Sequence, residues 1–75
     1  MSKLPAITSR EAIRAFGKAG FAEVRTRGGH TILAKEGHRY HLSIPVHKGR
    51  TLPRGLLQTL IRAAGLTEQE FRSLL

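Results

Sequence analysis

A histidine that follows two glycines is the feature of this sequence best suited to chemistry. His30 comes directly after Gly28-Gly29, and Arg25 and Arg27 precede the glycine pair. Two glycines allow a tight turn and leave backbone amides that can face a phosphate. An imidazole titrates near neutral pH, so it can take a proton from a ribose 2′-hydroxyl or give one to a leaving oxygen. The residue types alone favour a plainer interpretation, a hairpin turn followed by an ordinary strand histidine.

A second candidate is the basic loop that follows Pro45. In this loop His47 could contact a phosphate, serve as a second acid–base group or be a plain loop residue. Lys48 and Arg50 lie just ahead of an expected helix, whose positive N-terminal end would add to their attraction for phosphate. A solvated basic loop accounts for these residues equally well.

Other residues exclude several further kinds of site. His38 and His41 have neither Cys nor Asp beside them, so we expect no metal site and no cofactor. The chain has no Asp for a Ser-His-Asp set, no paired acids for glycosidase chemistry and no Walker-type phosphate loop. Arg10, Arg14 and Lys18 follow helical spacing, which indicates a solvated basic ridge more than a second RNA contact.

The charge of the chain favours a polyanionic partner. Thirteen Lys and Arg against five Glu give a net charge of +8, and residues 25–54 hold seven of those bases with Glu36 as their single acid. Such a positive electrostatic field on a small domain indicates a nucleic-acid partner in preference to a membrane surface. A basic surface that only keeps the protein in solution would have the same composition. The absence of cysteine excludes thiolate metal sites and agrees with a reducing, cytoplasmic location. No apolar run is long enough to span a membrane.

Helices and strands must position these side chains, and we expect a single domain over residues 1–75. Thr8 is expected to cap a first helix through a capping box with Glu11, and Gly20 to end that helix. Short β-branched and aromatic runs separated by glycines predict three strands. These strands are expected over residues 21–27, 30–35 and 39–44.

The third of these strands alternates apolar with polar residues, which predicts a sheet with one covered face and one open, basic face. Its apolar positions are Tyr40, Leu42 and Ile44. The register decides whether Ile32 or Leu33 faces the core. Thr51 is expected to cap a second helix with Pro53 in its first turn, and Thr67 to cap a short third one. The order α-β-β-β-α with a short added helix predicts a two-layer α+β domain, with its helices on one face of a three-stranded antiparallel sheet.

An ordered series of short motifs runs through nearly the whole chain. The motifs are Leu4-Pro5, Ala19-Gly20-Phe21, Arg25, Gly28-Gly29-His30, Ile44-Pro45-Val46-His47-Lys48-Gly49, Gly55-Leu56-Leu57, Ala64-Gly65-Leu66 and Phe71. This series resembles the HicA family of mRNA interferase toxins. The resemblance implies a double-stranded-RNA-binding-domain-like fold and a toxin endonuclease of a type II toxin–antitoxin pair with a role in stress response. It also implies inhibition by a HicB-type antitoxin protein.

The resemblance further implies which residues act. The catalytic histidine of the family lies in a Gly-Ser-His turn, which corresponds to Gly28-Gly29-His30 with Gly29 in place of Ser. His30 is therefore expected to cleave mRNA by metal-independent general acid–base catalysis. The expected RNA-binding residues are Arg25, Arg27, Gly28, Gly29, His47, Lys48, Arg50 and Arg54. The alternatives are a non-catalytic small RNA-binding module and a protein whose basic face serves only an acidic protein partner.

Overall fold

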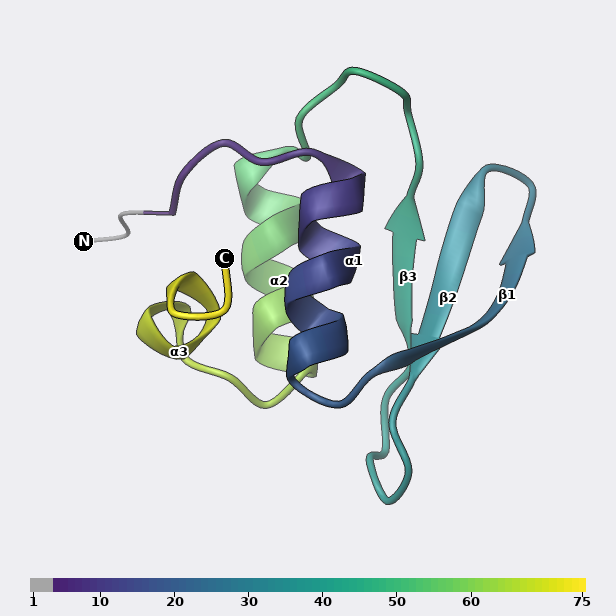
Figure 1. The fold of residues 1–75 in the computed structure, drawn as a ribbon, viewed down its shortest axis with the longest axis vertical. Helices are drawn as coiled ribbons and strands as arrows, with labels where there is room; N and C mark the ends of the chain where they lie inside the picture. The colour runs from purple at the N-terminus through teal and green to yellow at the C-terminus, as the bar shows by residue number, and fades with distance from the viewer. Residues whose placement is uncertain (1–3) are drawn as a thin grey trace.

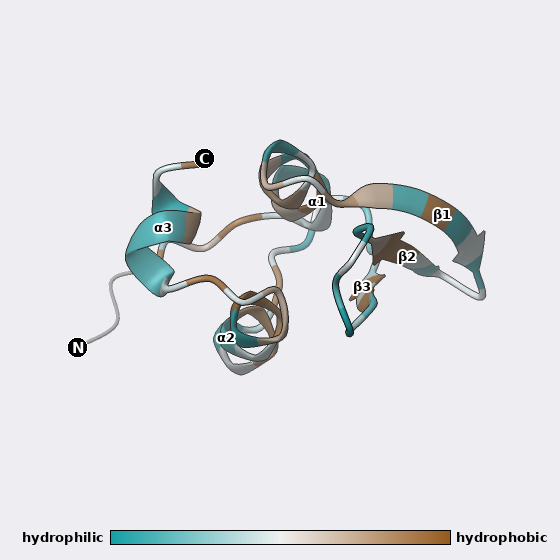
Figure 2. Ribbon diagram, turned by 90° about the horizontal axis from the view of Figure 1, so that it is seen from below, coloured by the Kyte–Doolittle hydropathy of each residue, from teal (hydrophilic) through white to brown (hydrophobic). Residues whose placement is uncertain are grey.

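Within the described part of the chain, three helices and three strands follow one another in the order expected from the sequence. The computed structural model describes residues 4–75, so residues 1–3 of the expected domain lie outside the described part. The elements are α1 (Ser9–Lys18), β1 (Ala22–Arg27), β2 (His30–Ala34), β3 (Leu42–Pro45), α2 (Arg54–Ala63) and α3 (Glu68–Arg72). The strands form one antiparallel sheet in the order β1-β2-β3. Helices α1 and α2 lie on one side of this sheet with α3 beyond them (Figures 1 and 2). The predicted α+β architecture is confirmed, and it is consistent with a double-stranded-RNA-binding-domain-like fold.

Local capping sets the beginning of two helices. The Glu11 N–H donates to the Thr8 hydroxyl over 3.2 Å, and the Thr8 N–H donates back to the Glu11 carboxylate over 2.9 Å. Thr67 and Glu70 repeat this capping box at α3, with distances of 3.0 and 2.8 Å. Each box satisfies backbone donors that the first turn of a helix leaves without an intrahelical partner. Both capping predictions are confirmed.

The α1 capping box makes a prediction about acid stability. Hydrogen bonds from the Thr8 backbone and then the Thr8 hydroxyl lower the pKa of Glu11 from its ordinary 4.5. A carboxylate whose pKa is lower in the folded state stabilises the fold above its unfolded pKa and loses this effect as the pH falls through its folded pKa. Glu11→Gln should therefore be less stable than the wild type at pH 7, with a gap that closes below about pH 4. Urea unfolding at several pH values measures this gap, and a gap of constant size would contradict the prediction.

The beginning of α2 differs from the prediction. The helix begins at Arg54 after Pro53, without a side-chain cap, so the expected cap at Thr51 is wrong. Proline disfavours the helical conformation for the residue before it, so Leu52 cannot open a helix. Thr51 instead forms a β-bridge with Thr8, and the Leu52 N–H donates to Ile7 O over 2.8 Å. The segment before α2 thus pairs with the segment before α1.

The third strand is shorter than predicted. It begins at Leu42, and Tyr40 is 53% exposed rather than covered. The loop before it turns toward α2, because His38 Nε2 lies 2.7 Å from Ala63 O and the His38 ring meets Phe21 edge-on at 5.2 Å. These contacts keep residues 39–41 out of the ladder. Pro45 ends the strand as expected.

The core lies between the helices and the two strands β2 and β3. Phe16 is at its centre, with the rings of Phe71 and Phe21 at 4.9 and 6.2 Å. The other large side chains that are almost fully buried are Leu33, Leu42, Ile44, Leu57 and Ile61. Leu33 faces this core and Ile32 is half-buried, which settles the register. All six residues of β1 are exposed, so the first strand extends beyond the cover of the helices.

Candidate nucleic-acid interface and active site

The turn before His30 depends on its two glycines. Gly28 and Gly29 have φ angles of +54° and +81°, and Arg27 pairs with His30 across them. A two-residue hairpin loop with positive φ at both positions is the type I′ turn, which L side chains adopt only with strain. A Cβ added at either glycine would meet no atom within 4 Å. Glycine is therefore required at these two positions by the positive φ angles, and not by a lack of room for a side chain.

The register places three of the expected site residues on one face of the sheet. Arg27 lies opposite His30, and Arg25 lies opposite Ile32. Residues directly opposite in an antiparallel pair point to the same face, and successive residues of a strand alternate. Because Thr31 and Leu33 are buried toward the helices, Arg25, Arg27 and His30 lie on the open face. An open face is present as predicted, and its basic residues in the strands are Arg25, Arg27 and His30. Residues 39–41, whose alternation suggested this face, lie outside β3.

The His30 side chain is exposed and has one contact that orients it. Its Nδ1 lies 3.4 Å from Gly28 O. A carbonyl oxygen only accepts hydrogen bonds, so this contact favours the tautomer with the proton on Nδ1. The Nε2 atom of that tautomer carries a free lone pair and can act as a base. The arrangement can take up a proton from a ligand that lies on the open face.

The basic loop of residues 46–50 lies beside the glycine turn. The Val46 N–H donates to Gly29 O over 2.7 Å, which holds the two loops together. His47, Lys48 and Arg50 are exposed. His47 and Lys48 line a hollow of about 490 Å³ together with Thr8, Ser9, Arg10, Val46 and Gly49. His47 and Lys48 thus face the beginning of α1, whereas Lys48 was expected, together with Arg50, at the beginning of α2.

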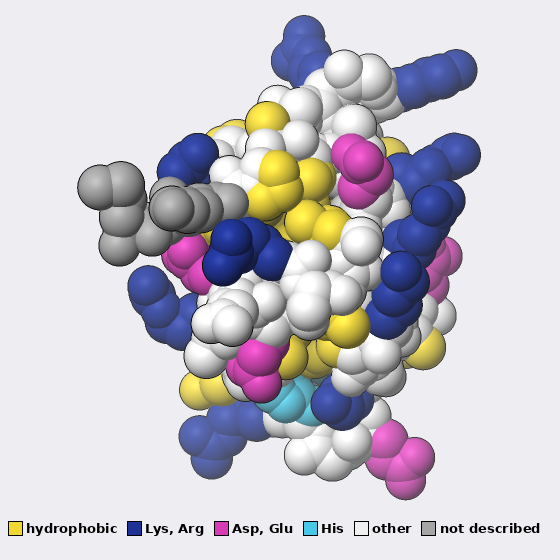
Figure 3. Space-filling view, turned by 60° about the vertical axis from the view of Figure 1, so that its left-hand side comes forward, with side chains coloured by type: hydrophobic (Ala, Val, Ile, Leu, Met, Phe, Trp, Pro, Cys, Tyr) yellow, Lys and Arg dark blue, Asp and Glu magenta, His cyan; other side chains and the backbone are white. Residues whose placement is uncertain are grey.

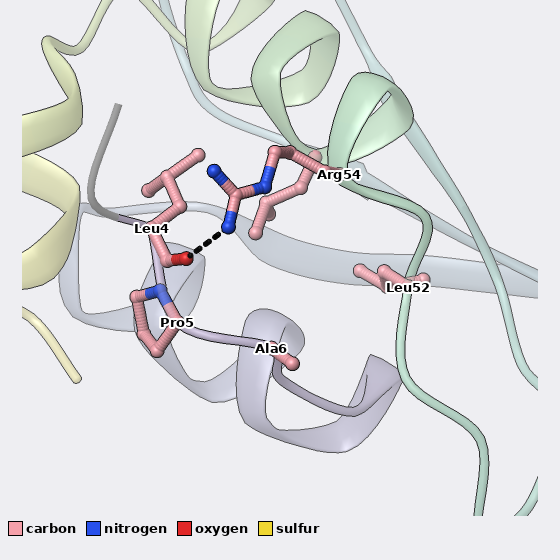
Figure 4. A pocket seen from close by; sticks show the side chains of 6 residues that line it. Leu4, Pro5, Ala6, Leu52 and Arg54 are labelled. Carbon is pink, nitrogen blue, oxygen red and sulfur yellow. Dashed lines mark hydrogen bonds between the residues drawn. The ribbon is translucent and has the colours of Figure 1, made fainter. Parts of the chain in front are cut away.

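Arg54 is used differently from the other expected RNA-binding residues. Its Nη2 donates to Leu4 O over 3.3 Å, from the wall of a hollow of about 120 Å³ (Figure 4). The other residues around this hollow are Leu4, Pro5, Ala6, Leu52 and Leu57. This guanidinium holds the N-terminal segment against α2. The structure does not bring Arg54 to the open face with His30.

Arg10 is a candidate that sequence reasoning assigned only to the basic ridge. It lines the hollow beside His47 and Lys48, and also a second one of about 200 Å³ with Ile13, Glu23, Thr31 and Val46. Helical spacing could not reveal this, because the neighbours of Arg10 come from distant parts of the chain. Figure 3 shows Lys and Arg side chains spread along the margins of the helical side as well. Positive charge is therefore not confined to the open face, and the location of His30 distinguishes the open face from the helical side.

His38 and His41 lie in different surroundings. His38 is part-buried against the end of α2, and His41 is exposed just before β3. Among residues 4–75 no three His, Cys, Asp or Glu side chains are grouped so that they could hold a metal ion. No helix within the same residues is long and apolar enough to cross a membrane.

Comparison with known protein families gives a match over most of the chain. Residues 9–66 match the family described as the HicA toxin of bacterial toxin-antitoxin systems. The chain belongs to the HicA toxin family. The matched region runs from α1 to just past α2, so it includes the glycine turn, His30 and the loop of residues 46–50. A search of curated proteins found no match.

Family membership confirms the resemblance inferred from the sequence. This HicA-family chain is the toxin of a toxin–antitoxin system, and that membership implies an antitoxin partner. The part of the chain beyond residue 66 lies outside the family match, and it contains α3 with Phe71. Phe71 packs on Phe16 of α1, so α3 completes the core beneath the matched region.

Proposed function

We propose that this toxin is an endoribonuclease that cleaves mRNA without a metal ion, with His30 as its general acid–base catalyst. The observation that carries the proposal is the exposed imidazole of His30 on the same sheet face as Arg25 and Arg27, within the region matched to the toxin family. Arginine suits phosphate because its planar fork can donate two hydrogen bonds. Together the three side chains provide one imidazole that can accept a proton and two guanidinium groups that can bind a phosphate.

The proposed reaction is an internal transesterification. His30 Nε2 takes the proton of a ribose 2′-hydroxyl, and the 2′ oxygen forms a bond to the adjacent phosphorus. The bond from phosphorus to the 5′ oxygen breaks, and that oxygen receives a proton from the His30 imidazolium or from His47. Arg25, Arg27 or Lys48 stabilises the negative charge on the phosphorane. The products are a 2′,3′-cyclic phosphate and a 5′-hydroxyl.

The proposal extends to the partners of the toxin. The substrate is single-stranded or locally unpaired mRNA, bound mainly through phosphate contacts that carry little sequence information. The antitoxin is of the HicB type, and it inhibits cleavage by covering the His30 turn with an acidic surface that neutralises the basic face. The pair acts in the cytoplasm.

Incubation of purified toxin with RNA in EDTA tests the mechanism. We expect cleavage at an undiminished rate and fragments that end in a 2′,3′-cyclic phosphate, because no step requires a metal ion. Mass spectrometry of the fragments identifies the ends, and a 2′-deoxy substitution at the cleaved position serves as the control that removes the nucleophile. Loss of cleavage on chelation, or fragments with 5′-phosphate ends, would contradict the proposed chemistry.

A non-catalytic RNA-binding module is the second candidate. Two features favour it, because both leave few groups for catalysis. Gly29 has no hydroxyl, and His30 is the one histidine within the described strands. Such a module would bind RNA with a steep dependence on salt and leave it intact. Intact RNA after long incubation, together with salt-dependent binding, would decide for this candidate.

A further inference from the structure

The outer edge of β1 is a strand edge available to a partner. Within residues 4–75, β1 lies at one side of the sheet and pairs with β2. All of its residues are exposed, and Val24 is 55% exposed. Figure 1 shows the β1–β2 hairpin extending away from the helices. A strand edge of this kind presents backbone donors and acceptors that can pair with another extended chain.

The hairpin geometry identifies which backbone groups face outward. Arg27 and His30 close a two-residue turn, so they exchange both backbone hydrogen bonds, and such pairs alternate along an antiparallel ladder. The N–H and C=O of Thr26 are therefore directed away from β2. Toward the start of the strand, the register shifts between Glu23 and Arg25, which leaves Val24 as the extra residue of a bulge. The usable edge is thus short and centred on Thr26.

Charge decides which chain fits this edge. Arg25 and Arg27 flank Thr26 and lie on one face, with the acid Glu23 before the bulge and on the other face. A second copy paired edge to edge would bring these arginines against their equivalents, and a bulge with charged side chains is a common protection against that self-pairing. An extended partner segment in which two acidic residues are separated by one other residue would present both carboxylates on the same face. These carboxylates would then lie beside Arg25 and Arg27.

We propose that the β1 edge receives an extended acidic segment of the antitoxin, which adds a fourth strand to the sheet at Thr26. The inference rests on the antitoxin partner of the proposed function and names the surface that it uses. The added strand neutralises Arg25 and Arg27, and it lies on the far side of β1 from His30. Antitoxin and RNA therefore compete for the same two guanidinium groups.

The experiment compares Thr26→Pro with Thr26→Val in binding to the antitoxin encoded beside the toxin gene. Proline removes the outward N–H but is tolerated on a strand edge, whereas valine keeps the N–H and suits a strand. We expect Thr26→Pro to weaken binding by roughly tenfold, since it removes one backbone hydrogen bond and obstructs the next strand. Thr26→Val should bind like the wild type. Calorimetric titration measures both, and equal affinities for the two variants would overturn the proposal.

A second measurement does not depend on a folded proline variant. Hydrogen exchange at the Thr26 amide of the wild type should slow strongly in the complex, because an outward N–H becomes hydrogen-bonded. Unchanged exchange there would overturn the proposal, as would a toxin that forms dimers through this edge. RNA cleavage by Thr26→Pro should stay within about twofold of the wild type. A wild type that binds antitoxin but cuts no RNA would refute the nuclease function and leave the docking result intact.

Discussion

Replacing His30 with alanine is expected to lower the rate of RNA cleavage by about 10²–10⁴-fold, the usual contribution of a positioned general acid–base group. RNA affinity should change by less than about threefold, because the phosphate contacts come from the arginines. The fold should be unaffected, since the side chain is exposed and its one contact is with Gly28 O. Single-turnover cleavage and RNA binding, measured on the same preparation, separate the two effects.

Two matched variants make this result specific. His41→Ala removes an exposed imidazole that lies just before β3, and it should cleave at the rate of the wild type. His47→Ala asks whether the loop histidine returns the proton to the leaving oxygen, in which case the alkaline limb of the pH–rate profile should change. Full cleavage by His30→Ala would exclude this imidazole from the reaction.

Replacing Phe16 with alanine is expected to cost about 3–5 kcal/mol of unfolding free energy. Phe16 is fully buried and contacts the rings of Phe21 and Phe71, so its removal opens a cavity between α1, α3 and the start of β1. A domain of this size is stable by only about 4–11 kcal/mol. The variant should therefore unfold at a much lower urea concentration or fail to fold.

Phe16→Leu is the control for this measurement. It keeps most of the apolar volume and should lose clearly less stability than the alanine variant. The region matched to the family includes Phe16, whereas Phe71, which packs against it, lies outside that region. Equal stability of the wild type and Phe16→Ala would mean that α3 does not complete the core as described.

Features decided by neighbouring residues could be predicted from the sequence. The two capping boxes require only Thr and Glu three positions apart, and both formed as expected. The glycine turn and the end of β3 at Pro45 also follow from local conformational limits. Arg25, Arg27 and His30 share a face because a two-residue turn fixes the register of the hairpin that holds them.

Features decided by distant contacts could not be predicted in this way. Tyr40 was expected in the covered layer, but His38 draws its loop toward Ala63. Arg54 was expected to bind RNA, yet its guanidinium reaches Leu4, fifty positions away. Arg10 lines a hollow with His47 and Lys48 because the chain brings α1 beside the loop of residues 46–50. No pattern within one segment contains such information.

The short hydrogen bond from Val46 N–H to Gly29 O has a consequence for motion. It joins the hairpin tip that presents His30 to the segment that carries His47 and Lys48. We therefore expect the two loops to move together, so that a ligand that orders one of them also orders the other. The entropic cost of ordering the two loops is thereby shared, so the second contact of a bound strand forms more readily than the first.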